Sequence, residues 1–262
     1  MIIDVHAHSG NINQALFWAA DAETLERYAA EAGVDLLVVS AAKAIMYDAS
    51  DGNAELDCDL KKTTKLLGYV VVNPMFPDSI NDLDLMKSNT KFKGAKIHPD
   101  YHGYDMKSQA IQDFLGGVAD RVPLMLFHCS CMPGTGFAAY SQIIRFAKNH
   151  PKTNIIMAHM AGLFQNPIYP YFPNFEGLEA VKQAACDNVY VDTAHHLMYV
   201  YPGVMERMIN LIGPEHIVYG TDVPLQGPMQ MRFAIESIMA QKVPQSDKDL
   251  MLYGNAMRLL CI

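Results

Sequence analysis

Eight short apolar runs alternate with segments of helical pattern along almost the whole chain, and this order constrains the fold more than any other feature. The runs lie at 2–8, 35–40, 67–72, 92–98, 123–128, 154–159, 188–192 and 217–222. Helical spacing of apolar residues marks 20–33, 55–66, 79–87, 107–120, 140–149, 176–186, 202–212, 231–241 and 247–260. Because successive parallel strands need helical crossovers, the pattern predicts an α/β protein with a parallel sheet.

Eight such units favour a closed (β/α)8 TIM barrel over an open sheet. The chain has 262 residues, and such barrels commonly run to about 250 residues as one unit. An open doubly wound sheet is the alternative, but no Gly-X-Gly-X-X-Gly turn follows the first strand. No internal repeat, low-complexity tract or linker-like change of composition divides the chain, so we expect a single domain over 1–262.

The amino-acid composition limits the classes of molecule that the protein is expected to bind. Half of the residues are hydrophobic and 18% are charged, which suits a large buried core. The net charge of −8 argues against nucleic acid or an anionic membrane surface as a partner, so we expect a small-molecule substrate. Five scattered cysteines, no basic hydrophobic leader and no apolar run near the ~20 residues of a spanning helix predict a cytoplasmic protein. Whether the chain forms a homo-oligomer is left open.

The amino-terminal strand ends in two histidines one residue apart. Because strand side chains alternate in direction, His6 and His8 should project to the same side, and Asp4 should share their face and orient one ring. Neutral imidazole is a good ligand for zinc and similar ions. The strand end therefore predicts half of a tetrahedral metal site.

Further polar side chains stand at the carboxyl ends of other predicted strands. They are His98 on strand four, His128 on strand five, His159 on strand six and Asp222 on strand eight. In a parallel barrel these ends share one rim, which is where active sites are built. We predict His6, His8, His128 and Asp222 as ligands of one divalent ion, with Zn²⁺ as the expected ion and Mn²⁺ as the alternative.

Such an ion would lower the pKa of a bound water toward ~7 and polarise a carbonyl group. Asp222 is predicted to accept the proton of that water. His159 is predicted to hydrogen-bond a developing oxyanion or to protonate a leaving group, and a role as a further ligand is the alternative.

With these motifs the sequence resembles the amidohydrolase superfamily. Within it, the sequence is similar to the amidohydrolase-related branch that contains aminocarboxymuconate semialdehyde decarboxylase and similar metal-dependent hydrolases. The resemblance rests on DVHAH at 4–8, GAKIHP at 94–99, FHC at 127–129, IIMAHM at 155–160 and YGTDVP at 219–224. It implies a (β/α)8 barrel, a divalent ion at the positions of His6, His8, His128 and Asp222, and a catalytic role for His159.

Strand four departs from the pattern of the binuclear relatives, which place a carboxylated lysine or a glutamate there to bridge two ions. Here the candidates are Lys96 and His98, two residues apart and therefore expected on one face. In the branch that the sequence resembles, these positions more often face the substrate. We therefore expect one ion and substrate contacts from Lys96 and His98, with carboxylation of Lys96 and a second ion as the alternative.

Loop residues complete the set of candidates. Trp18 in the first loop and His195 after strand seven are predicted substrate contacts. His150 and His216 precede strands six and eight and should lie on the opposite, stability face of the barrel. Alternation turns Cys129 away from the His128 side, so we interpret it as a small buried residue.

Three functions fit these residues. The leading hypothesis is a metal-dependent hydrolase of a small carbonyl compound, such as an ester, amide or lactone. The second is a nonoxidative decarboxylase of a small unsaturated or aromatic carboxylic acid, and the third is a noncatalytic metal-binding barrel. The six arginines all lie away from the strands' carboxyl ends, which favours hydrolysis, although Lys43 or Lys96 could hold an acid.

Overall fold

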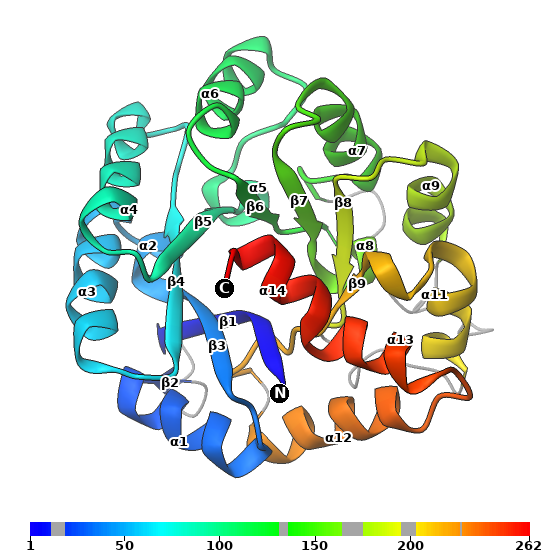
Figure 1. Cartoon of the computed structure of the whole chain (residues 1–262). Helices are drawn as coiled ribbons and strands as arrows, with labels where there is room; N and C mark the ends of the chain where they lie inside the picture. The colour runs from blue at the N-terminus through cyan, green and yellow to red at the C-terminus, as the bar shows by residue number, and fades with distance from the viewer. Residues whose placement is uncertain (12–18, 131–135, 164–174, 195–202, 226) are drawn as a thin grey trace.

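The computed structural model describes residues 1–11, 19–130, 136–163, 175–194, 203–225 and 227–262, and it is organised around one curled sheet (Figure 1). Eight of its strands run parallel: β1 (Ile3–Asn11), β3 (Leu36–Ala41), β4 (Leu66–Val71), β5 (Phe92–Ile97), β6 (Leu124–Phe127), β7 (Asn154–Met157), β8 (Val189–Asp192) and β9 (Ile217–Val218). The short strand β2 (Ala19–Ala20) pairs antiparallel with the end of β1. The predicted parallel α/β architecture is confirmed.

Backbone hydrogen bonds connect the two edges of this sheet. The amide of Val5 on β1 donates to the carbonyl of Tyr219 at 2.9 Å, and the amide of Asp222 donates to the carbonyl of His6 at 2.8 Å. The regular strand β9 ends at Val218, four residues before the end of the predicted strand 217–222. The chain after Val218 contacts β1 through single backbone hydrogen bonds and an isolated parallel bridge between Ala7 and Val223, not through a continuous ladder. The segment that carries Asp222 is thus held directly against β1.

Helices surround the sheet (Figure 1). The longer ones are α1 (Ala22–Ala32), α3 (Ala49–Lys62), α6 (Gln109–Ala119), α7 (Tyr140–Asn149), α9 (Glu176–Ala184), α11 (Val204–Ile212) and α12 (Pro228–Met239). Their ends follow local signals: the Asp21 side chain accepts the amide of Thr24 at the start of α1, and Gly33 closes that helix with a φ of 78°.

Shorter helical pieces replace two predicted helices and add others. The segment 79–87 is a 3₁₀ helix, η2 (Pro77–Asp84), followed by α4 (Leu85–Ser88). The last predicted helix is divided into α13 (Gln245–Asp249), a π-helical turn η4 (Leu250–Gly254) and α14 (Asn255–Leu260), while η3 (Pro214–His216) precedes β9. Three short helices after strand ends were not predicted: α2 (Ala42–Met46), α5 (Pro99–His102) and α8 (Ala158–Gly162).

The core has two layers. Strand residues that point into the ring, such as Val38, Leu67 and Leu124, form an inner apolar cluster with Leu259 and Leu260 of α14. A larger cluster fills the space between the strands and the outer helices. In Figure 1, α14 lies across the near end of the ring, close to both termini. This apolar helix packs against the inner cluster at one end of the curled sheet.

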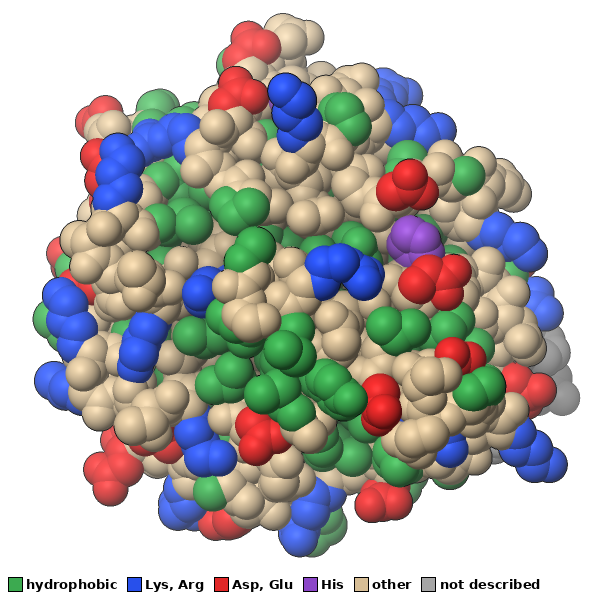
Figure 2. Space-filling model, viewed as in Figure 1, with side chains coloured by type: hydrophobic (Ala, Val, Ile, Leu, Met, Phe, Trp, Pro, Cys, Tyr) green, Lys and Arg blue, Asp and Glu red, His purple; other side chains and the backbone are tan. Residues whose placement is uncertain are grey.

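Charged side chains of both signs share the surface around α14 (Figure 2). Figure 2 shows lysine and arginine side chains interspersed with acidic ones on the face around α14, without one continuous basic patch. Among the described residues, no helix combines the length and the apolar character needed to cross a membrane.

Candidate metal centre

Two imidazoles and one carboxylate converge where β1 meets the segment after β9. The ligand atoms of His6, His8 and Asp222 all lie within 4.8 Å of one another, and all three side chains are buried. The Asp222 Oδ1 atom is 2.8 Å from Nε2 of His8 and 3.3 Å from Nε2 of His6. Two nitrogens and one carboxylate oxygen around one point form a donor set that suits zinc and related divalent ions.

The far side of each imidazole is anchored. Nδ1 of His6 is 2.8 Å from Asp192 Oδ2, and Nδ1 of His8 is 2.9 Å from the Ser40 hydroxyl. Both Nε2 atoms are therefore turned toward Asp222. Histidines that bind metals are commonly oriented by a partner on the other ring nitrogen. This arrangement fits a divalent ion.

Burial also sets the protonation of these rings. Desolvation lowers the pKa of His6 and lowers the pKa of His8 to about 4, although Asp222 opposes the shift in both cases. Both imidazoles are then neutral at pH 7, which is the form that donates an electron pair to a metal.

A β-bulge changes the predicted role of Asp4. Asp4 pairs with Leu37 and Ala7 pairs with Val39, so β1 fits an extra residue between them and the alternation shifts. The Asp4 side chain consequently accepts the amides of His6 and Thr221 at 3.0 and 3.1 Å instead of orienting an imidazole ring. Burial raises the pKa of Asp4 to about 7.

Lys96 brings a cation to the same place. It is fully buried on β5, and its Nζ atom lies 2.9 Å from His6 Nε2. Burial lowers the pKa of Lys96 to about 8, with Asp222 and Asp192 opposing the shift. At neutral pH an ammonium group therefore adjoins the three candidate ligands.

His98 lies next to His128 rather than in the ligand group. Its ring stacks on the His128 ring with a centroid distance of 4.0 Å, and its Nδ1 accepts the amide of Tyr101 at 3.3 Å. Burial holds the pKa of His98 well below its usual value. The predicted neighbours Lys96 and His98 thus occupy adjoining parts of the same rim.

His128 does not join the three-residue group. Its Nε2 atom is 2.8 Å from Asp100 Oδ2, and its Nδ1 atom is 3.1 Å from Nε2 of His159. Asp100 also accepts bonds from the Ser130 hydroxyl and the amide of Phe137. The structure therefore links His128 to His159 and to the short helix α5.

His159 lies in an unusual turn directly after β7. The residues at 159–161 have φ values of 58°, 51° and 58°, and Gly162 follows with 80°. The amide of His159 donates to Asp192 Oδ1 at 2.8 Å, and its ring centroid lies 5.3 Å from that of His6. The turn ends the predicted strand two residues early and directs His159 toward the ligand group.

Sequence reasoning missed three polar residues at the site: Ser40, Asp100 and Asp192. Asp192 ends the seventh predicted strand, so the strand-end rule that selected the histidines would also have found it. Ser40 likewise ends the second predicted strand, whereas Asp100 lies two residues beyond the fourth. Only the folded chain shows their contacts with His8 and His128.

Of the other residues singled out in the sequence, the structure describes Cys129 but not Trp18 or His195. Cys129 is fully buried in the outer apolar cluster, as expected. The predicted substrate contacts Trp18 and His195 lie outside the described residues.

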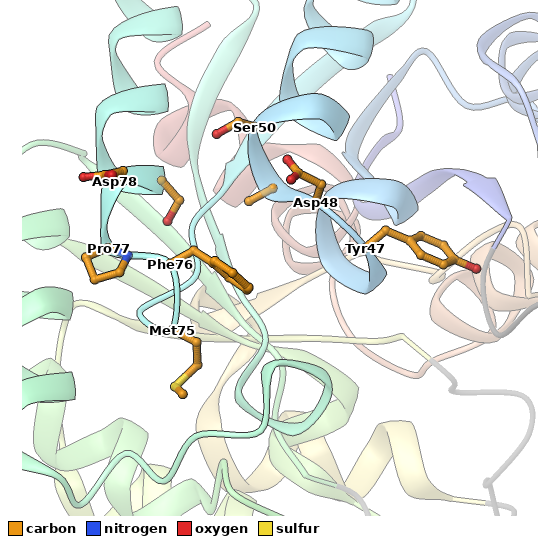
Figure 3. A pocket seen from close by; sticks show the side chains of 9 residues that line it. Tyr47, Asp48, Ser50, Met75, Phe76, Pro77 and Asp78 are labelled. Atoms are coloured by element: carbon orange, nitrogen blue, oxygen red, sulfur yellow. The ribbon is translucent and has the colours of Figure 1, made fainter.

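A separate hollow of about 320 Å³ opens beside the starts of α3 and η2 (Figure 3). Tyr47, Asp48, Met75 and Phe76 contribute to its lining, and Figure 3 shows the rings of Tyr47 and Phe76 on different segments. Its described lining residues include neither histidine nor lysine, so this hollow shares none of the chemistry of the ligand group.

Sequence comparison relates the chain to a known family. The model of the amidohydrolase family matches residues 3–262. A search of curated protein sequences finds no match.

Solved structures of low sequence identity share the fold. The chain is similar to 2,6-dihydroxybenzoate decarboxylase from Rhizobium, with 16% identity, coverage of 99% of this chain and 98% of that chain, and a TM-score of 0.74. The manganese-bound dihydroxybenzoic acid decarboxylase from Polaromonas sp. JS666 is 17% identical to this chain, with a TM-score of 0.72. That match covers 99% of this chain and 96% of the other. A probable 2-pyrone-4,6-dicarboxylic acid hydrolase from Acinetobacter baumannii, with bound citric acid, is 14% identical to this chain, with a TM-score of 0.71. That match covers 100% of this chain and 99% of the other.

The resemblance seen in the sequence is thereby confirmed. The family match extends over nearly the whole chain, including the strand ends that carry His6, His8, His159 and Asp222. The chain belongs to the amidohydrolase family.

Proposed function

We propose that this chain is a metal-dependent, nonoxidative decarboxylase of a small unsaturated or aromatic carboxylic acid. The observation that carries this proposal is the buried ammonium group of Lys96, 2.9 Å from His6. A second positive charge beside a divalent ion suits a substrate carboxylate, whereas a neutral ester or amide gains little from it. The scarcity of arginine favoured hydrolysis in the sequence, and Lys96 supplies the cation that arginine does not.

The relatives support this order of the two activities. The Rhizobium and Polaromonas structures are decarboxylases of dihydroxybenzoic acids by name. Their identities of 16% and 17% carry the fold alone, so the substrate class is our inference for this chain. Decarboxylation, ranked second from the sequence, is therefore the better supported of the two activities.

We propose His6, His8 and Asp222 as ligands of one divalent ion. His128 is the fourth residue that we propose, and its use by the ion would replace one of its ring contacts with Asp100 or His159. Zn²⁺ remains our expected ion, and Mn²⁺, which the Polaromonas relative binds, is the alternative.

When bound, the ion would supply positive charge that holds and polarises substrate oxygens. We propose that Lys96 and His98 orient the substrate, with Trp18 and His195 as further proposed contacts. Decarboxylation breaks the bond to the carboxylate carbon, leaves the electron pair on the substrate carbon and releases CO₂. That carbon must take up one proton, and we propose Asp222 and His159 as the residues that move it.

The proposal takes the protein as a single closed (β/α)8 barrel over residues 1–262. The hydrogen bonds of Val5 with Tyr219 and of His6 with Asp222 support closure, because they link the first and last strands around the ring. Closure matters for the chemistry, since it brings the β1 histidines and Asp222 to one point.

Hydrolysis is the second candidate, and a specific observation favours it. The Acinetobacter relative is by name a hydrolase of a pyrone dicarboxylic acid, so a buried cation also suits a lactone that carries a carboxylate. Asp222, next to both histidines, could accept a proton from an attacking water. Carboxylate binding alone therefore does not separate the activities, but the product does.

The deciding experiment measures CO₂ release. Metal-free protein is reconstituted with Zn²⁺ or Mn²⁺ and incubated with a panel of hydroxybenzoic acids, their methyl esters and lactone carboxylates. We expect CO₂ from free acids only, and a raised KM for those acids in Lys96→Met, which keeps the side-chain length but removes the charge. Hydrolysis of esters or lactones without any CO₂ would replace the decarboxylase with the hydrolase.

A further inference from the structure

We propose that Asp192 is a positioning residue that fixes the tautomer of His6 and ties this proposed metal ligand to the backbone of His159. One carboxylate would then hold the metal site and the proton-transfer residue in register. The inference rests on the proposed function in that it assigns His6 to the metal and His159 to proton transfer.

The Asp192 carboxylate accepts hydrogen bonds from N–H groups of three residues. The side chain is fully buried at the end of β8, where its Oδ2 atom lies 2.8 Å from His6 Nδ1. Its Oδ1 atom accepts the amides of His159 at 2.8 Å and Ala194 at 3.0 Å. A carboxylate accepts hydrogen bonds at both oxygens and donates none, so it satisfies all three N–H groups at once.

Two partners select the same tautomer of His6. A hydrogen on Nδ1 donates to Asp192, which leaves the lone pair on Nε2. The ammonium group of Lys96, 2.9 Å from that Nε2 atom, is a donor and needs the same lone pair. Nε2 is also the atom that faces His8 and Asp222, so the selected tautomer is the one that can bind a metal.

Packing holds His6 and Asp192 together. A Cβ atom at Gly220 would lie 3.1 Å from Cβ of His6 and 3.2 Å from Cβ of Asp192. These distances are shorter than ordinary van der Waals contact, so a side chain at 220 would push both residues. Glycine at this position allows their close approach.

The link to His159 holds a costly backbone conformation. His159 has a φ of 58°, in the left-handed region, where the Cβ atom of an L-residue crowds the backbone. Its amide is fixed by the same carboxylate that holds His6. A change at Asp192 should therefore disturb both histidines, which a partner of one ring alone would not do.

Asp4 offers a matched control. It is an equally buried carboxylate that contacts the backbone amide of His6, but not its ring. Its other partners are the amide and the hydroxyl of Thr221, and a hydroxyl can donate or accept. In Asp4→Asn, the new amide group can donate to that hydroxyl, so the site tolerates the exchange.

Asp192→Asn has no such tolerance. An amide NH₂ that faces His6 would donate to Nδ1 and move the ring hydrogen to Nε2. The flipped amide would instead place NH₂ against the amides of His159 and Ala194, which are donors themselves. Either orientation therefore breaks a contact that the carboxylate makes.

The test is ¹⁵N NMR of the histidine rings in metal-free protein, combined with calorimetric titration of Zn²⁺ alone. We expect wild type and Asp4→Asn to show His6 with its hydrogen on Nδ1. Asp192→Asn should move this hydrogen to Nε2 or mix the tautomers, and should weaken Zn²⁺ binding by about 10–100-fold. Unchanged tautomer and affinity in Asp192→Asn would overturn the inference.

Two further readouts keep the result decisive. If Asp192→Asn does not fold, a wild-type spectrum with the His6 hydrogen on Nε2 would by itself refute the inference, and one with it on Nδ1 would support it. Gly220→Ala keeps every polar group and should shift the same His6 signals. A wild type that binds no Zn²⁺ would reject the proposed function, whereas the tautomer measurement would still decide the role of Asp192.

Discussion

Histidines lie at both ends of the curled parallel sheet, and the groups that contact their rings differ. At the rim, rings of His6 and His128 meet the carboxylates of Asp192 and Asp100 at 2.8 Å. At the end near α14, Nδ1 of His216 lies 2.7 Å from the backbone carbonyl oxygen of Val189 and gives that oxygen a hydrogen-bond partner. The rings of His6 and His128 thus face ionisable side chains, whereas the ring of His216 faces a backbone carbonyl.

The position of each histidine relative to its strand explains this difference. His150 and His216 precede β7 and β9, and the ring of His150 packs on Phe146 with a centroid distance of 4.3 Å. Residues that follow parallel strands gather at the opposite rim. The predicted structural placement of both is confirmed.

The largest expected effect is at a proposed ligand. His8→Ala removes one of three converging donor atoms, so metal affinity should fall by more than the ~100-fold that loss of an outer partner causes, and turnover should vanish. Metal content after dialysis and CO₂ release measure both effects. Retention of stoichiometric metal in this variant would contradict the ligand assignment.

His159→Ala should separate metal binding from catalysis. His159 is not among the ligands that we propose, so the ion should stay, while loss of an acid–base group should reduce kcat by about 10²–10⁴-fold. Calorimetry with Zn²⁺ and steady-state kinetics on the same preparation provide the two values. Full turnover would remove His159 from the mechanism.

His102 tests whether a place at the rim is enough to make a histidine functional. Its ring lies 6.3 Å from that of His98, and burial lowers its pKa to about 4, although a backbone hydrogen bond with Ile45 opposes the shift. The unfolded chain then binds more protons between pH 4 and about 6.5, so stability falls as the pH falls through this range.

The slope from this residue approaches one proton, or about 1.4 kcal/mol per pH unit. His102→Gln should flatten the dependence of the free energy of unfolding on pH by that amount, as measured by urea denaturation, without changing metal affinity. An unchanged slope would show that His102 does not stay neutral in the folded protein.

Asn255 provides the smallest expected effect, at the opposite end. Its Nδ2 atom donates to the carbonyls of Pro214 at 2.8 Å and Ile217 at 2.7 Å. Asn255→Ala leaves both carbonyls without this donor and should cost about 1–3 kcal/mol of stability, with metal affinity and kcat unchanged. A lower metal affinity in this variant would show that the two ends are coupled, against the division drawn above.

Much of this fold is predictable from local sequence. Helix α7 matches its predicted bounds, because its apolar periodicity and its flanks are unambiguous. The bulge between Asp4 and Ala7 was missed, since it depends on the register of β1 against β3. Likewise, the early end of β9 depends on contacts between the residues after it and β1. These contacts join distant parts of the sequence: the hydrogen bond between Asp4 and Thr221 links residues that are 217 positions apart.

The site divides in the same way. The strand-end rule located His6, His8 and Asp222, whose convergence needs only parallel strands in a ring. The same rule also covers Asp192, which ends the seventh predicted strand, but it could not reveal that the Asp192 carboxylate contacts the His6 ring or that the His128 ring contacts Asp100 and His159. Those contacts depend on loop conformations after the strands, which local periodicity does not encode.

The most direct test of a metal-dependent enzyme at this rim is elemental analysis of the purified protein, in parallel with Asp222→Ala. The account predicts one divalent ion per chain in the wild type after reconstitution and a clear loss in the variant. Absence of metal from the reconstituted wild type, or equal metal content in Asp222→Ala, would contradict it.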